Sequence, residues 1–377
     1  MPVDHDSCEL LRAIVRAPHD LDAHRIRVLA DKVGDWDALL TLAQEHCVLP
    51  ILFMRLAQMD INVPAAAQQR LRAEYDRNVL HNLTNAAELI EVLNVFEREM
   101  IPAMPFKGAV LGASVYHDLT TRTAGDLDLL IYPGDIARST DILLKRGYEL
   151  ITDTSSDPDC YEYHFERQTD GMVLEIRWML ELTQPRFRRD LGMDWIWPHR
   201  RTIMLAGAEV PDMNPEMTLL VLCMHGSKHL WSRLLWIHDV AQLVASSPGL
   251  DWSAVIRQAK ASGLRRALAL GVLLAHRVVG ISIPPAILRS FESDATACRL
   301  AHYVDENLLD APGSFPIGRV PYNVQILDFQ DRVKLLFSFD FLRPNERDMT
   351  ALALPKSLHA LYYLIRPFRI LWDRSAR

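Results

Sequence analysis

The sequence predicts an α+β protein in which a small mixed sheet is flanked by an N-terminal and a C-terminal helical region. Residues 1–100 and 211–377 repeat apolar side chains at helical spacing, whereas 101–210 alternates short apolar runs with helical segments. We therefore expect three parts with these bounds. With 49% hydrophobic and 24% charged residues, the chain has the composition of an ordinary globular protein.

The N-terminal part is expected to end in a long helix. Residues 65–100 contain neither glycine nor proline, and their apolar positions recur every three or four residues. Pro64 stands where a helix can begin, because its missing N–H costs nothing there. One long helix, or two helices joined by a kink, is predicted over this range.

The middle part is expected to hold the sheet. Gly147 is suited to end a helix, and Asp170-Gly171 is a strong hairpin signal between two strands. Helices are predicted over 109–116 and 134–146, and strands over 104–106, 127–131, 148–152, 161–167 and 173–178.

The C-terminal part returns to helical spacing. Asn214 is a good helix cap and Pro215 a good first helical residue. The last predicted helix mixes apolar and arginine residues; it could lie on a membrane or a partner, but packing on the neighbouring helices is favoured. The predicted helices cover 215–230, 233–246, 251–261, 263–279, 284–308, 327–342 and 355–373, with a loop at 310–314.

Charge and cysteine content indicate which binding partners and which cellular compartment to expect. The formal net charge of −7 gives no general attraction to nucleic acid, so no stable DNA binding is expected. Five widely spaced cysteines indicate reduced thiols rather than disulfides or a cysteine zinc site. The acidic first residues lack the features of a secretory signal, and no apolar run is long enough to span a bilayer. We expect a cytoplasmic protein.

Three segments of the middle part carry candidate chemistry. The first is Lys107-Gly108-Ala109, where a strand runs into a glycine and then a helix. Glycine permits a sharp turn, and the start of a helix offers free N–H groups that suit phosphate. An ordinary strand-to-helix turn is the alternative.

The second segment places two acids on one strand. Asp126 and Asp128 alternate with leucines, so their carboxylates share one face. Two adjacent carboxylates repel each other unless a cation lies between them, and oxygen ligands of this kind suit magnesium. The alternative is an exposed strand start with two acids of no special role.

The third segment adds Glu175 on a later apolar strand. If this strand neighbours 127–131, Glu175 can face the acid pair and complete a cluster able to hold two metal ions. Alone, Glu175 would be a surface acid or an ion-pair partner of Arg177. The cluster requires that Glu175 point toward the aspartates and that no salt bridge fill the space between them.

Together these segments resemble the polymerase-beta-type nucleotidyltransferase superfamily, and most closely its bacterial group of uncharacterised nucleotidyltransferases. The resemblance covers about residues 30–373. It departs at Ala109, where a second Gly or Ser is usual, at Glu175, where Asp is common, and at Arg177, where His often stands. The matching features are Phe106-Lys107-Gly108, Tyr116, Arg122, Asp126-Leu127-Asp128, Glu175 with Trp178, the His- and Trp-rich stretch 225–239, and 354–367.

The resemblance implies transfer of a nucleoside monophosphate from a nucleoside triphosphate, with ATP as the default donor, to an acceptor hydroxyl. Asp126, Asp128 and Glu175 would hold two Mg²⁺ ions, with Glu175 on the acceptor side. Lys107, Gly108 and Ala109 would hold the β- and γ-phosphates. Arg122 would neutralise the departing pyrophosphate; a surface arginine in a polar loop is the alternative.

The helical part supplies further candidates. His225, Lys228 and His229 share a predicted helix and could touch nucleotide or acceptor. Two other interpretations stay open, namely histidines packed between helices and a zinc pair. Asp239 is expected to be an internal hydrogen-bond acceptor rather than a catalyst.

The acceptor itself stays open: a small molecule, a protein side chain or a tRNA end. Segment 186–201 combines arginines with tryptophans and could bind nucleic acid, but a solvated loop is favoured because acids dilute its charge. Two rivals remain. One is a non-catalytic nucleotide-binding or scaffold protein, and the other is a transferase that modifies nucleic acid.

Overall fold

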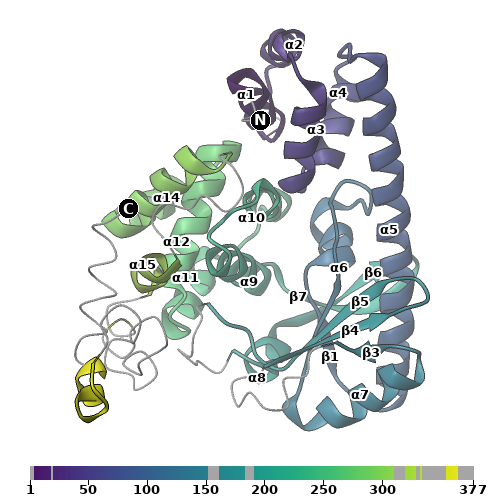
Figure 1. Ribbon diagram of the computed structural model, residues 1–377, viewed down its shortest axis with the longest axis vertical. Helices are drawn as coiled ribbons and strands as arrows, with labels where there is room; N and C mark the ends of the chain where they lie inside the picture. Colours follow the sequence, from purple (N-terminus) through teal and green to yellow (C-terminus); the bar gives the residue numbers. More distant parts are fainter. Residues whose placement is uncertain are drawn as a thin grey trace.

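The computed structural model describes residues 4–17, 20–151, 161–182, 191–309, 319–327, 332 and 354–363. Figure 1 shows the sheet on one side, with the long helix α5 running along it, and the C-terminal helices on the other side. The first four helices lie at one end of the molecule, above both. The protein is thus α+β with a small mixed sheet, as predicted.

The described part of the N-terminal region forms five α-helices, and aspartates begin three of them. Asp4, Asp22 and Asp35 each accept a backbone N–H at a helix start, which satisfies a donor that the helix leaves unpaired. The expected long helix is one continuous element that follows Pro64. The helices are α1 (His5–Ile14), α2 (Ala23–Lys32), α3 (Trp36–Glu45), α4 (Leu49–Gln58) and α5 (Ala65–Arg98).

The five-stranded sheet has the order β1-β2-β5-β4-β3. Strands β2 and β5 are parallel, and the other neighbours are antiparallel. The hairpin between β4 and β5 turns at Gly171, whose φ of 68° explains the glycine. The strands are β1 (Ala103–Pro105), β2 (Leu127–Ile131), β3 (Glu149–Leu150), β4 (Glu162–Arg167) and β5 (Met172–Arg177).

Short helices connect these strands. After β1 comes α6 (Gly108–Leu111), which continues as a π-helix, η2 (Gly112–Tyr116). After β2 come a 3₁₀ turn, η3 (Pro133–Asp135), and α7 (Ile136–Lys145). The predicted helices over 109–116 and 134–146 are confirmed by these elements.

The favoured loop at 186–201 is wrong for its described part, residues 191–201. There the chain forms α8 (Met193–Ile196) and a 3₁₀ turn, η4 (Trp197–His199), and then enters a two-stranded sheet of β6 (Arg200–Leu205) and β7 (Ala208–Met213). One of its arginines is used internally, since Arg201 donates to Asp212 Oδ2 at 2.8 Å, whereas Arg200 is exposed. Residues 186–190 lie outside the described residues.

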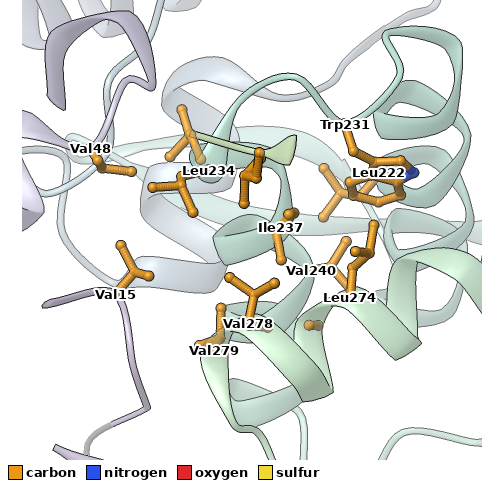
Figure 2. Packing of buried hydrophobic residues seen from close by; sticks show 14 of the residues in the cluster. Val15, Val48, Leu222, Trp231, Leu234, Ile237, Val240, Leu274, Val278 and Val279 are labelled. Carbon is orange, nitrogen blue, oxygen red and sulfur yellow. The ribbon is translucent and has the colours of Figure 1, made fainter. Parts of the chain in front are cut away.

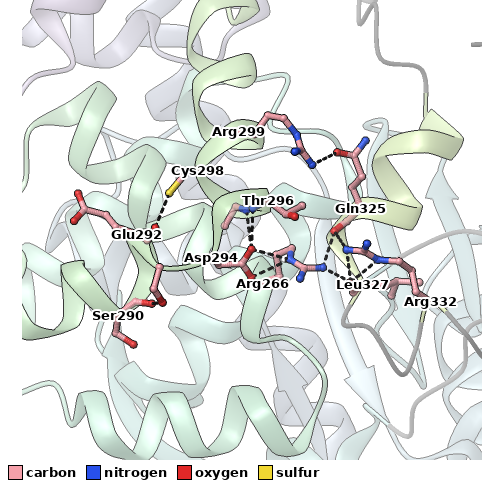
Figure 3. A network of polar contacts seen from close by, with 12 residues as sticks. Arg266, Ser290, Glu292, Asp294, Thr296, Cys298, Arg299, Gln325, Leu327 and Arg332 are labelled. Carbon is pink, nitrogen blue, oxygen red and sulfur yellow. Dashed lines mark hydrogen bonds and ion pairs between the residues drawn. The ribbon is translucent and has the colours of Figure 1, made fainter. Parts of the chain in front are cut away.

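The C-terminal region is helical, but the single helix predicted over 284–308 is wrong. It is two helices, because Asp294 caps the second one by accepting the N–H groups of Thr296 and Ala297. Figure 3 shows Arg266 joining this cap to the carbonyls of Gln325 and Leu327. The helices are α9 (Pro215–Lys228), α10 (Leu234–Ser246), α11 (Trp252–Ala261), α12 (Arg265–Leu274), η5 (Ala275–Val279), α13 (Pro285–Glu292), α14 (Ala295–Asn307), α15 (Arg319–Ile326) and η6 (Lys356–Leu361).

Several expectations fall on residues that the structure does not describe. The predicted loop at 310–314 and nearly all of the predicted helix at 327–342 lie there. The same holds for the part of the 355–373 helix beyond residue 363. Of the five cysteines, the four described ones are free thiols. Within the described ranges, no helix combines the length and the apolar character that crossing a membrane requires.

The N-terminal helices and the C-terminal helices share one hydrophobic core. Figure 2 shows Val15 and Val48 in the same cluster as Leu234, Val278 and Val279. The backbone also joins the two regions, since the N–H of Ala17 donates to the carbonyl of Val279 at 2.7 Å. A second core lies between α5 and the sheet. The sheet is therefore positioned by α5 on one side and by the shared helical core on the other.

Candidate active site

The parallel pairing of β2 with β5 brings the three predicted acids together. In this register Asp128 lies directly beside Glu175, and Asp126 precedes β2 by one residue. Each of the three offers a carboxylate oxygen, and these oxygens lie within 4.8 Å of one another. Glu175 therefore faces the aspartates, as the cluster hypothesis requires.

Crowding shifts the pKa values of two of these carboxyls in opposite directions. Burial, and then the charge of Glu175, raise the pKa of Asp126. Burial alone would also raise the pKa of Glu175, but the hydrogen bond with His164 and the charge of Arg177 outweigh it, so this pKa is lowered. A proton shared by the hydrogen-bonded pair therefore belongs on Asp126 rather than on Glu175.

Two cations already contact the cluster, contrary to the expectation that no salt bridge would lie there. Lys107 Nζ is 3.1 Å from Asp128 Oδ2. Arg177 forms an ion pair with Glu175, and its Nε is 3.5 Å from Asp128 Oδ1. The four-carbon stem of Lys107 is flexible, whereas Arg177 sits on the strand itself. Of the two requirements, the orientation of Glu175 toward the aspartates is met, whereas the absence of a salt bridge among the acids is not.

The carboxylate set fits a divalent metal ion. The Asp128 side chain is 3% exposed, and its Oδ1 accepts no hydrogen bond from the described residues; Arg177 Nε, at 3.5 Å, forms only an ion pair with it. A buried carboxylate oxygen without a hydrogen-bond donor is costly unless a cation satisfies it. Three crowded carboxylates that offer only oxygen are the ligands that Mg²⁺ prefers.

The Lys107-Gly108 turn lies against the start of β2. Both residues have positive φ, 65° and 47°, which glycine adopts freely and lysine does not. A side chain at Gly108 would meet the carbonyl of Asp126 at 3.7 Å, and the N–H of Phe106 donates to the carbonyl of Asp128 at 3.2 Å. Ala109 is buried in the core, so only its backbone can serve a ligand.

Arg122 does not have the position that either interpretation gave it. It is 6% exposed, so it is not a surface residue. Its Nε and Nη2 donate to the two carboxylate oxygens of Asp239, at 2.9 and 3.0 Å. Because this bidentate pair engages the guanidinium inside the protein, the expected role on pyrophosphate is corrected to a structural link with α10.

Asp239 is an internal hydrogen-bond acceptor, as predicted. Besides Arg122, it accepts the hydroxyl of Tyr116 at 2.7 Å. The buried Asp239 carboxylate thus joins Tyr116, at the end of the π-helix η2, to Arg122 in the loop that leads into Asp126. Burial raises the pKa of Tyr116 well above its ordinary value, and the charge of Asp239 adds to this effect.

The end of α9 lies near the carboxylate cluster. Lys228 Nζ donates to the hydroxyl of Tyr161, which precedes β4, at 2.9 Å. Burial lowers the pKa of Lys228, the charge of Arg177 lowers it further, and that of Glu162 opposes them. His229 and His225 pack on each other and on Trp236, with ring centroids 4.6 to 5.3 Å apart. Neither histidine belongs to a possible metal group of three or more ligands among the described residues.

The sequence reasoning missed two members of the site, Glu162 and His164 on β4. The antiparallel register places His164 beside Glu175 and Glu162 beside Arg177. His164 Nδ1 is 3.0 Å from Glu175 Oε1, and its Nε2 is 3.4 Å from Glu162 Oε1. The signal was present as polar residues alternating with Tyr163 and Phe165, but it points to a site only once β4 is known to adjoin β5.

Comparison with known families assigns the chain. The sequence model of a family described as uncharacterised nucleotidyltransferase matches residues 32–280, which is more than half of the chain. A search of curated proteins finds no match. The matched range contains α3 to η5, including the five-stranded sheet, the three acids and α9. The chain therefore belongs to this nucleotidyltransferase family.

Proposed function

We propose that the protein transfers a nucleoside monophosphate from a nucleoside triphosphate, ATP by default, to an acceptor hydroxyl, with release of pyrophosphate. In this proposal Asp126, Asp128 and Glu175 hold Mg²⁺. The observation that carries it is the gathering of these three carboxylates by the β2–β5 register, beside an Asp128 oxygen that has no hydrogen-bond donor in the described residues. Membership of the family supports it independently.

The donor half of the site is assigned to the turn before α6. Bound Mg²⁺ supplies positive charge that stabilises the phosphoryl oxygens during in-line displacement. Lys107 lies close enough to Asp128 to share its charge between this carboxylate and the β- and γ-phosphates. The backbone N–H groups of Gly108 and Ala109 follow in the same turn and can donate to phosphate.

The acceptor half is assigned to Glu175 and the facing end of α9. His164 and Arg177 hold the Glu175 carboxylate from two sides, which orients it and favours its ionised form. An ionised carboxylate at this place can accept the proton of the acceptor hydroxyl. Lys228, the last residue of α9, interacts electrostatically with Arg177 and Glu162. Lys228 and the following residue, His229, are candidates for contact with nucleotide or acceptor.

The acceptor is proposed to be a small molecule, a protein side chain or a tRNA end. The net charge of −7 does not favour general binding to nucleic acid, and we propose no stable DNA complex. Measuring acceptor affinity at several salt concentrations separates these cases. A nucleic-acid acceptor loses affinity steeply as salt rises, whereas a small molecule does not.

Thermal stabilisation by nucleotide tests the proposal. ATP with Mg²⁺ is expected to raise the melting temperature of the wild type, and ~100-fold excess over Kd corresponds to about 2.7 kcal/mol. Asp126→Asn is expected to lose this stabilisation. Glu209→Gln, which changes an exposed acid on β7, is the matched control and should keep it.

A second measurement separates catalysis from mere binding. ATP labelled at the α-phosphate should pass its label to an acceptor in a cell extract with the wild type, and not with Asp126→Asn. Binding without label transfer would instead support the non-catalytic alternative. Absence of any stabilisation of the wild type by ATP, GTP, CTP or UTP with Mg²⁺ would refute the proposed function.

A further inference from the structure

The guanidinium of Arg177 lies among three carboxylates. Its Nη1 forms an ion pair with Glu162, its Nη2 with Glu175, and its Nε is 3.5 Å from Asp128 Oδ1. The Arg177 side chain is 13% exposed, so water screens these contacts weakly. Each of its three nitrogen atoms thus faces a different acid.

The strand register accounts for this position. Arg177 follows Glu175 by two residues on β5, so both side chains lie on the same face of the sheet. The antiparallel pairing with β4 places Arg177 directly beside Glu162, and the parallel pairing with β2 places Asp128 beside Glu175. The guanidinium is therefore held by the sheet and does not depend on a flexible loop.

By distance alone, the described residues offer two groups of possible metal ligands that share Glu175. One is the aspartate pair with Glu175, and the other is Glu162 and His164 with Glu175. In the second group both glutamates already have Arg177 as their counter-ion. An arginine stays charged at any ordinary pH, so a divalent ion added there would be repelled by it.

The first group differs because Asp126 has no ion pair with Arg177 in the described part of the chain. Asp128 is shared between two cations, since Lys107 Nζ lies 3.1 Å from its Oδ2 and Arg177 Nε lies 3.5 Å from its Oδ1. Among the described residues Asp126 is therefore the acid of this group without an ion pair, and a further cation is needed chiefly on its side of the cluster, next to the Lys107 turn. On the Glu175 side, that need is already met by an arginine.

We propose that Arg177 takes the place of a second metal ion, so that the loaded site holds one divalent cation at Asp126 and Asp128. Arg177 then supplies the fixed positive charge on the acceptor side, next to Glu175. This inference rests on the proposed function and replaces the two ions expected from the sequence. It identifies Arg177 as a residue of the site through its contacts with three carboxylates.

Counting bound Mn²⁺ tests the inference without measuring activity. Mn²⁺ is titrated into an equimolar complex of protein with α,β-methylene-ATP, and free Mn²⁺ is measured by electron paramagnetic resonance. The wild type is expected to bind one equivalent. Arg177→Gln removes the charge and is expected to bind two, whereas Arg177→Lys keeps a charge and should bind one.

The outcomes are separable. Two equivalents in the wild type, one equivalent in Arg177→Gln, or two in Arg177→Lys each overturn the inference. Circular dichroism checks that both variants fold, and the wild-type count alone decides the question if Arg177→Gln does not. Unchanged Mn²⁺ binding in Asp126→Asn would instead count against the proposed function, whatever the number of ions.

Discussion

Replacing Asp239 with alanine is expected to lower the free energy of unfolding by about 4–6 kcal/mol. The Asp239 side chain is 1% exposed and its partner Arg122 is 7% exposed. Removing one member of a buried ion pair leaves the other charge buried without compensation, which costs about 3–5 kcal/mol. The hydroxyl of Tyr116 also loses an acceptor at 2.7 Å, which adds about 1 kcal/mol.

Urea unfolding followed by circular dichroism measures this loss. Two further variants serve as controls, one at an exposed ion pair and one that replaces both members of the buried pair. Asp170→Ala removes a carboxylate that is 42% exposed and pairs with Arg167 at 2.8 Å, so it should cost no more than ~1 kcal/mol. The double variant Arg122→Met with Asp239→Leu replaces the pair by apolar side chains and should recover most of the stability. A cost for Asp239→Ala no larger than that for Asp170→Ala would refute the reasoning.

Two further predictions concern the sheet and the helical core. Hydrogen bonds to Glu162 and Glu175 raise the pKa of His164 to about 10, above its ordinary 6.5, so its contribution to stability is complete below pH 6.5 and is lost as pH rises toward 10. Without metal, the melting temperature of His164→Gln should therefore depend less on pH across this window than that of the wild type; parallel profiles would contradict this. Gly226→Ala should destabilise by about 1–3 kcal/mol in urea, because its new Cβ would lie 2.4 Å from the ring of Trp231, whereas Gly249→Ala, with open space around it, should change little.

Local patterns in the sequence predicted those parts of the site that depend on a single strand. The alternation of Asp126 and Asp128 with leucines follows from the two-residue period of a strand, and that period needs no knowledge of the rest of the fold. The Asp-Gly hairpin between β4 and β5 is equally local. Glu175 was placed correctly only on the condition that its strand adjoins β2, since sequence does not fix the order of strands in a sheet.

Features that depend on distant partners could not be predicted in this way. Arg122 was expected near phosphate, but its partner Asp239 is 117 residues further along the chain. Arg177 was considered only as a partner of Glu175, and its contacts with Glu162 and Asp128 require the full order of three strands. The hairpin of β6 and β7 was missed although Ala206 and Gly207 form its turn, because the arginines and tryptophans before it suggested a loop.

The common core of the two helical regions has a consequence for synthesis of the chain. Arg16 donates to the carbonyl of Val278 across a separation of 262 residues. At about 5–20 residues per second, a ribosome needs roughly 13–52 s to make that intervening stretch. During this time the apolar faces of α1 to α4 wait without their partner. The nascent protein is thus exposed to aggregation early. A fragment trimmed to the family match at 32–280 would lack α1 and nearly all of α2, and would leave uncovered the part of the shared core that these helices pack on.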